Sequence, residues 1–301
     1  MNKLWIESQE RDAYLDLFHR ARLPELVLAR SPEEADIVLA DPPRIAPVLD
    51  SFTTMAWLQS TFAGVDALVT TPRRDYILTN VQGIFGALMA EYVMGCLINH
   101  FRHLPQYREQ QNAETWKQLP YEGLAGKHLV LVGAGSIGSH VGRMAGMFGL
   151  LVTAVTRSGR PVEGIANCIA VSEMETVLPD ADIIVSTLPG TKQTQGLFNR
   201  DFFSRCSDAV FINVGRGNVV DEAALLEALE QKQVQHAFLD VFVQEPLPAG
   251  NPLWKYPAVT ITPHISAHSF PQQVFALFAD NYLRWQRGEQ LESVVDMERG
   301  Y

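Results

Sequence analysis

The chain has few cysteines, no long apolar run and no surplus of positive charge. Its three cysteines, Cys96, Cys168 and Cys206, show no CxxC spacing, so neither a disulfide framework nor a metal site is expected. No stretch reaches the roughly 18 apolar residues of a membrane span. The net charge of −10 argues against a nucleic-acid surface. The early polar residues MNKLWIESQERD are unlike a secretory signal, and we expect a cytoplasmic protein.

Short apolar runs alternate with helical patterns along most of the chain, as is typical of parallel α/β structure. The length of 301 residues suits two domains. The strands and helices are most sharply patterned from residue 127 onward. We therefore expect a dinucleotide-binding domain over residues 99–270. It would be inserted into a discontinuous substrate-binding domain formed by residues 1–98 and 271–301.

A glycine loop, GAGSIG at residues 133–138, directly follows the apolar strand predicted over 128–132 and opens a helix. The first glycine permits a tight turn, the second lets the backbone approach a pyrophosphate, and the third allows close helix packing. The N–H groups of the helix N-terminus would face the phosphates. A glycine-rich turn without a ligand is the alternative. We expect a bound dinucleotide to contact Gly133, Gly135, Ser136, Ile137 and Gly138.

The residues after the next strand bear on which dinucleotide binds. Sites that prefer NAD usually place Asp or Glu there to hold the ribose 2′-hydroxyl. This chain has no carboxylate at that point and carries Arg157, Ser158 and Arg160 instead. A guanidinium can pair with a 2′-phosphate, so the pattern predicts a preference for NADPH, with NAD also possible. The alternative is that both arginines are merely solvated.

Three candidate catalytic residues follow three predicted strands, where ligands bind in such sheets. Arg216 stands between glycines and could hold a carboxylate through two parallel hydrogen bonds. His264 is suited to give a proton to the oxygen of a ketone that is being reduced. Glu245 behind the imidazole would orient it and raise its pKa. Each residue alone could be structural, and His268 is a rival for His264.

At these motifs the chain resembles the D-isomer-specific 2-hydroxyacid dehydrogenase family. GAGSIG, INVGRGNVVDEAALLEAL, LDVFVQEPLP and ITPHISAHS carry the resemblance, which covers nearly the whole chain. The segments TRSGR, NPLW and VDMERGY are similar to the glyoxylate/hydroxypyruvate reductase A branch. The resemblance implies two Rossmann-like domains with doubly wound parallel sheets.

The same resemblance implies roles for particular residues. Arg216 would bind the substrate carboxylate and carbonyl oxygen, His264 would donate the proton, and Glu245 would pair with His264. The backbone at Ala63 and Gly64 would hold the carboxylate, and Asp240 would contact the nicotinamide carboxamide. Further cofactor contacts would come from Leu188, Pro189, Val214, Gly215, Asp240, His264 and Ser266.

The expected partners are a small 2-keto acid and a second copy of the chain. The family resemblance suggests a homodimer, with residues 101–121 as the candidate contact and Trp116 either reaching the partner or anchoring on the surface. Two other functions stay open. One is a dehydrogenase on the same fold for a bulkier keto acid, formate or phosphite. The other is a dinucleotide-sensing corepressor, although the sequence offers no basic stretch or recognition helix for it.

Overall fold

The computed structural model describes residues 1–300, which form two compact units. One unit consists of Met1–Ile84 together with the residues from Ser269 onward, and the other is Phe85–His268. The sequence predicts the boundaries at 98/99 and 270/271 instead. No helix among residues 1–300 is both long and apolar enough to cross a membrane.

The difference at the first boundary concerns one long helix, α4 (Phe85–Phe101), which belongs to the second unit. Its buried side chains, such as Met89 and Val93, share one apolar cluster with Leu129 and Leu131 of the second sheet. The helix therefore contributes to the second core, although its sequence immediately follows the strands of the first.

The first unit contains a parallel sheet with the strand order β2-β1-β3-β4-β5. Its strands are β1 (Asn2–Glu7), β2 (Leu26–Leu28), β3 (Ile37–Ala40), β4 (Trp57–Ser60) and β5 (Ile77–Thr79). Its helices are α1 (Arg11–Ala21), α2 (Pro42–Ile45), α3 (Asp66–Val69) and α9 (Pro271–Gln286), with 3-10 turns at Pro32–Glu34 and Ala46–Ser51. Trp57 of β4 stacks on Phe278 of α9, which fixes that helix to the sheet.

The second unit contains a seven-stranded parallel sheet with the order β12-β11-β10-β9-β6-β7-β8. Its strands are β6 (His128–Val132), β7 (Leu151–Thr156), β8 (Asn167–Ala170), β9 (Ile183–Ser186), β10 (Ala209–Asn213), β11 (Val234–Leu239) and β12 (Val259–Ile261). Besides α4, its helices are α5 (Leu104–Asn112), α6 (Ser136–Met147), α7 (Arg200–Ser204) and α8 (Glu222–Glu230). Its 3-10 turns are Val171–Thr176, Gly217–Val219 and Pro252–Lys255.

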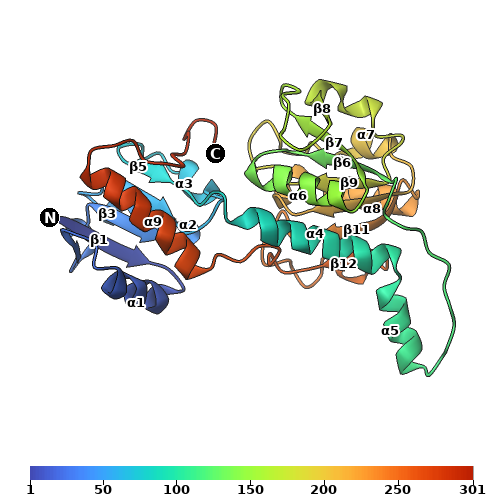
Figure 1. The fold of residues 1–301 in the computed structure, drawn as a ribbon, viewed down its shortest axis with the longest axis horizontal. Coiled ribbons are helices and arrows are strands. Elements are labelled where there is room, and N and C mark those ends of the chain that lie inside the picture. Colours follow the sequence, from blue (N-terminus) through green and yellow to red (C-terminus); the bar gives the residue numbers. More distant parts are fainter. Residues whose placement is uncertain (301) are drawn as a thin grey trace. The chain divides into compact units, whose positions relative to one another are not determined.

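Helices cover both faces of this second sheet, because successive side chains of a strand point to opposite faces. In β6, Leu129 and Leu131 belong to the cluster that α4 and α6 complete. Val130 and Val132 belong to the cluster on the other face, which α7 and α8 complete. Figure 1 shows α4 and α6 alongside each other on one face. The structure thus confirms two doubly wound parallel sheets.

The strand order of the second sheet reverses at β6, whose neighbours are β7 on one side and β9 on the other. Chain segments that leave the carboxyl ends of β6 and β9 diverge to opposite faces, and a crevice forms there in sheets of this type. The loop with the three glycines follows β6 at this point. The fold therefore places the predicted dinucleotide loop at the switch point of the sheet.

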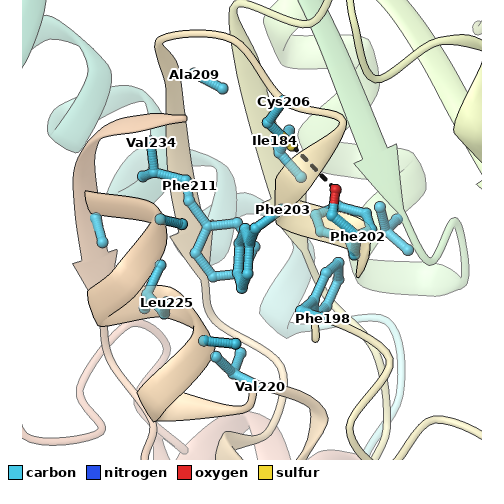
Figure 2. Packing of buried hydrophobic residues seen from close by; sticks show 14 of the residues in the cluster. Ile184, Phe198, Phe202, Phe203, Cys206, Ala209, Phe211, Val220, Leu225 and Val234 are labelled. Carbon is cyan, nitrogen blue, oxygen red and sulfur yellow. Dashed lines mark hydrogen bonds between the residues drawn. The ribbon is translucent and has the colours of Figure 1, made fainter. Parts of the chain in front are cut away.

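Four phenylalanines pack against one another in the core on the α7/α8 face (Figure 2). The rings of Phe198 and Phe202 lie 4.8 Å apart between centroids, and those of Phe203 and Phe211 lie 5.4 Å apart, both edge to face. Such contacts add to the stability that burial alone supplies. The core thereby holds β10, which carries Arg216 just beyond its end, against α7.

Truncating one of these rings should destabilise the second unit. We expect Phe203→Ala to lower the free energy of unfolding by about 3–5 kcal/mol, because a fully buried ring leaves a cavity. Urea denaturation followed by circular dichroism measures this change. Phe148→Ala removes a ring that is 44% exposed and serves as the control. Equal midpoints for the two variants would contradict this account of the core.

Candidate active site

The glycine loop leaves β6 and enters α6 with geometry that only glycine supports. Gly133 has a φ of +96°, and a side chain on Gly138 would place its Cβ 2.0 Å from the carbonyl oxygen of Gly133. A Cβ on Gly135 would meet no atom within 4 Å, so space is open above this residue. Ser136 begins α6, and no side chain caps the helix N-terminus. The backbone N–H groups there can bind an anion.

Two orphaned hydroxyls lie on the strands that flank β6. The Oγ1 atom of Thr156 at the end of β7 and the Oγ atom of Ser186 at the end of β9 are buried without a hydrogen-bond partner. Buried hydroxyls are normally satisfied. Together with the open space at Gly135, this fits a site shaped for a ligand at the switch point.

The arginines predicted to select the cofactor follow Thr156. Arg157 and Ser158 are exposed, and Arg160 donates to the carbonyl oxygen of Ala134 in the glycine loop at 3.3 Å. A pocket of about 240 Å³ lies between Arg160, the glycine loop and Arg143 of α6. Arg143 escaped the sequence analysis, because nothing in its spacing separates it from other helix arginines. The residues present fit the adenosine end of a dinucleotide, with positive charge available near the ribose.

The other predicted cofactor segments come close to the loop. Thr187 donates through Oγ1 to the carbonyl oxygen of Gly133 at 2.5 Å, which brings Leu188 and Pro189 beside the glycine loop. A Cβ on Gly215 would lie 2.4 Å from the carbonyl oxygen of Leu188. Val214 and Gly215 therefore pack directly against this segment.

Arg216 follows β10 between two glycines whose backbones contact neighbouring loops. A Cβ on Gly217 would lie 1.8 Å from the carbonyl carbon of Phe242, so no side chain fits there. The Asn213 side chain holds the turn, since its Oδ1 accepts from Gly215 N–H at 3.2 Å and its Nδ2 donates to the Arg216 carbonyl at 2.9 Å. Asn213 was missed from the sequence. The only signal for it was its place in the motif before Gly215.

Glu245 and His264, which lie 19 positions apart in the chain, meet through a direct hydrogen bond. The Nδ1 atom of His264 lies 2.8 Å from Oε2 of Glu245. The second carboxylate oxygen of Glu245 accepts the N–H of Phe242 at 2.9 Å. With Nδ1 directed at the carboxylate, Nε2 is left to exchange a proton with a ligand. Both side chains are partly exposed, so a ligand can reach them.

The electrostatics of this pair suit a proton donor. The hydrogen bond that His264 donates to Glu245 raises the pKa of His264 above its ordinary value, although burial and the charge of Arg216 act in the opposite direction. Burial alone would raise the pKa of Glu245, but the hydrogen bonds from His264 and Phe242 outweigh it and hold that pKa below its usual range. Arg216 also contributes to this lowering. The charge of Arg216 therefore acts on both members of the Glu245–His264 pair.

Asp240, expected near the nicotinamide, is fully buried at the end of β11. Its carboxylate accepts the N–H groups of Ile265 and Ser266, each at 2.9 Å. His264 donates its own N–H to the Asp240 carbonyl at 2.9 Å. Hydrogen bonds thus join Asp240, at the end of β11, to the turn after β12 that contains His264 and Ser266. The rival His268 is exposed, and it is His264 that carries the contact with Glu245.

In the first unit, the loop with Ala63 and Gly64 follows β4. The side-chain amide of Asn80 donates to the carbonyl oxygen of Ala63 at 2.8 Å, and Asn80 is almost fully buried. Because carbonyl and N–H point in opposite directions across a trans peptide, this bond also fixes the direction of the Gly64 N–H. Asn80 is a further residue that the sequence did not single out.

A doubly wound sheet with a glycine loop at its switch point, and an acid–base pair at neighbouring strand ends, defines an oxidoreductase that uses a nicotinamide dinucleotide. Comparison with known proteins narrows this class. Residues 94–266 match the profile of the D-isomer specific 2-hydroxyacid dehydrogenase, NAD binding domain. The chain belongs to this family, and the resemblance found in its motifs is confirmed.

Three relatives illustrate the similarity. The chain is 32% identical over 249 residues to glyoxylate/hydroxypyruvate reductase A of Serratia proteamaculans. This alignment covers 79% of each chain. A family member from Aeromonas salmonicida subsp. salmonicida superposes with a TM-score of 0.93 at 43% identity, covering 98% of this chain and 99% of that one. The NADPH-dependent glyoxylate/hydroxypyruvate reductase of Sinorhizobium meliloti, solved with NADP and sulfate, superposes with a TM-score of 0.89 at 26% identity, and the superposition covers both chains fully.

Removing the charge of Glu245 should lower the pKa of His264, because the hydrogen bond to Glu245 is the largest influence that raises it. We expect the His264 titration in Glu245→Gln to move to lower pH, measured by NMR on protein with ¹³C-labelled histidine. Glu222→Gln is a matched control, since Glu222 accepts from Val243 and Asn251 in the same loop. An unmoved His264 titration in Glu245→Gln would show that the pair is not coupled in solution.

Proposed function

We propose that this chain reduces a small 2-keto acid, of the glyoxylate or hydroxypyruvate type, to the 2-hydroxy acid and prefers NADPH. The observation that carries the proposal is the 2.8 Å contact between His264 and Glu245 within the electrostatic reach of Arg216. The similarity to reductases named for these two substrates supports the same choice of substrate.

His264 supplies the proton in this proposal. Reduction of a ketone leaves negative charge on oxygen, so a group that is protonated near neutral pH must lie beside it. Glu245 keeps the imidazole oriented and favours its charged form. Because the pKa of His264 is raised, the donor form persists to higher pH than for an ordinary histidine, and reduction is expected to decline as pH rises through that value.

Arg216 binds the keto acid. Its guanidinium can hold a carboxylate with two parallel hydrogen bonds and stabilise charge on the carbonyl oxygen. The backbone N–H groups at Ala63 and Gly64 of the first unit are proposed as further carboxylate donors, with Asn80 fixing the peptide between them. Positioning of the substrate and local charge then lower the barrier without a metal ion.

The cofactor is proposed to lie along Gly133, Gly135 and Gly138, with its adenosine end near Thr156. A bound nicotinamide dinucleotide supplies the hydride. Arg157, Ser158 and Arg160 would surround a 2′-phosphate, and a related protein from Xanthobacter autotrophicus Py2 was solved with NADPH (TM-score 0.88, 29% identity, 100% of this chain and 99% of that one). Asp240 and Ser266 would border the nicotinamide.

A cytoplasmic homodimer is the proposed state of the protein. The segment around α5 (Leu104–Asn112) is the candidate contact, since the Trp116 side chain that follows it is 97% exposed. Tryptophan is enriched at protein interfaces, which supports this segment as the candidate contact.

Removal of the proton donor should abolish most of the reduction. We expect His264→Ala to lower kcat by about 10²-fold or more, the usual contribution of a general acid. Arg216→Ala should mainly raise KM for the keto acid and also lower kcat, because the clamp acts before and during the reaction. Steady-state oxidation of NADPH with glyoxylate, hydroxypyruvate, pyruvate and phenylpyruvate measures both. His19→Ala and Arg200→Ala are surface controls, and near-normal turnover of His264→Ala would refute the assignment.

The arginines after β7 should set the cofactor preference. In Arg157→Ser/Arg160→Ser we expect kcat/KM for NADPH to fall about tenfold or more, as two charge-assisted contacts to the 2′-phosphate are lost. The value for NADH should change little, which makes NADH the internal control. Equal use of both cofactors by the unaltered protein would contradict the predicted preference.

A further inference from the structure

A line of hydroxyl groups joins helix α4 to the turn that carries His264. The Oη atom of Tyr92 lies 2.6 Å from Oγ1 of Thr262, and Oγ1 of Thr262 donates to Oδ1 of Asp240 at 2.5 Å. Tyr92, Thr262 and Asp240 come from α4, the end of β12 and the end of β11. All three belong to the second unit. Neither Tyr92 nor Thr262 binds the cofactor or the keto acid in the function proposed above.

The direction of the hydrogen bonds follows from the number of available protons. Thr262 has one hydroxyl hydrogen, and the carboxylate of Asp240 can only accept it. Thr262 must then receive its other hydrogen bond from the hydroxyl of Tyr92. Burial raises the pKa of Tyr92, which keeps that hydroxyl protonated and able to donate. The line therefore runs from Tyr92 through Thr262 to Asp240, and every member is satisfied.

The position of the Asp240 carboxylate matters because this carboxylate holds the turn that contains His264. His264 has a φ of +54°, a left-handed conformation that costs free energy in a residue other than glycine. Such a conformation persists only where its surroundings enforce it. The backbone N–H groups of Ile265 and Ser266 are tied to the Asp240 carboxylate on one side of the turn. The hydroxyl of Thr262 donates to Oδ1 of the same carboxylate, the oxygen that also accepts the N–H of Ile265.

We propose that Tyr92 and Thr262 are positioning residues for His264. Their hydrogen bonds fix the carboxylate of Asp240. Asp240 in turn holds the backbone around His264, so that the imidazole stays against Glu245. This inference rests on the proposed role of His264 as proton donor. The charged groups that act on the imidazole are Glu245, Arg216 and Asp240, and the line of hydroxyls orients the last of these.

The test removes single hydroxyls and reads the state of His264 directly. Thr262→Val and Tyr92→Phe each delete one donor at nearly constant shape. We expect the NMR titration of His264, recorded without substrate or cofactor, to move to lower pH as the contact with Glu245 loosens. In Thr262→Val kcat should fall about tenfold, the effect of losing one hydrogen bond to a charged group, and in Tyr92→Phe it should fall less, because the bond lost there joins two uncharged hydroxyls. KM for the keto acid should stay within about twofold, because Arg216 is untouched.

Two further variants separate positioning from general stability. Thr262→Ser keeps the hydroxyl and should restore both the titration and kcat. Thr260→Val is the matched control, because the hydroxyl of Thr260 in β12 contacts His236 at 2.9 Å and does not contact Asp240. This variant should change neither the His264 titration nor kcat. A lower melting temperature for Thr262→Val with an unchanged His264 titration and kcat would overturn the proposal. A rise in the pKa of His264 would also overturn it, since the hydroxyl would then only screen the Asp240 charge.

Failure of the proposed function would look different. If no keto acid is reduced by the unaltered protein but the His264 titration still shifts in Thr262→Val and recovers in Thr262→Ser, the positioning role stands without that reaction. If the reaction occurs and the titration is unaffected by either variant, the positioning role fails and the function stands.

Discussion

The buried carboxylate of Asp240 is the constraint on which the catalytic edge of the second unit depends. A carboxylate with no exposed surface is costly unless donors surround it, and here two backbone N–H groups and one hydroxyl do so. The need for these donors forces the chain after β12 to turn back toward β11. His264 lies at the centre of that turn. The hydrogen bonds that stabilise the buried carboxylate of Asp240 therefore also fix the direction of the His264 imidazole.

Close backbone packing at the neighbouring strand ends provides the second constraint. Gly217 lies against Phe242, and Gly215 against Leu188, with no room for a side chain at either glycine. The loops that follow β9, β10 and β11 are therefore held at fixed separations by main-chain contact rather than by flexible side chains. Arg216 extends from the middle of this arrangement, which explains why an arginine flanked by glycines can act at a defined place.

The sequence predicted what depends on local pattern. The apolar strand before the glycine loop and the alternation of strands and helices both follow from periodicity, and the structure has them. The strands β2, β5 and β8 were not predicted. The sequence also did not predict that α4 belongs to the second unit, since the residues against which it packs lie more than 30 positions further along the chain.

The candidate site divides in the same way. Arg216, Glu245 and His264 could be named because their chemistry is distinctive and their motifs resemble a known family. The residues that hold them were missed: Asn213 beneath Arg216, Asn80 beneath Ala63, and Thr262 with Tyr92 beside Asp240. These are ordinary polar residues whose importance arises only from a partner brought near by folding. No spacing in the sequence separates them from solvated asparagines, threonines and tyrosines.

The opposing influences on His264 also bear on when its proton is available. Glu245 raises the pKa of the imidazole and Arg216 lowers it. If Arg216 binds the carboxylate of the keto acid, as proposed, the bound anion offsets the guanidinium charge, and the influence of Glu245 then acts with less opposition. Binding of an anionic substrate would thus stabilise the protonated imidazole just when a proton is needed. A neutral ketone of the same shape would bring no negative charge to Arg216, so the charge of the substrate selects for reaction as well as for binding.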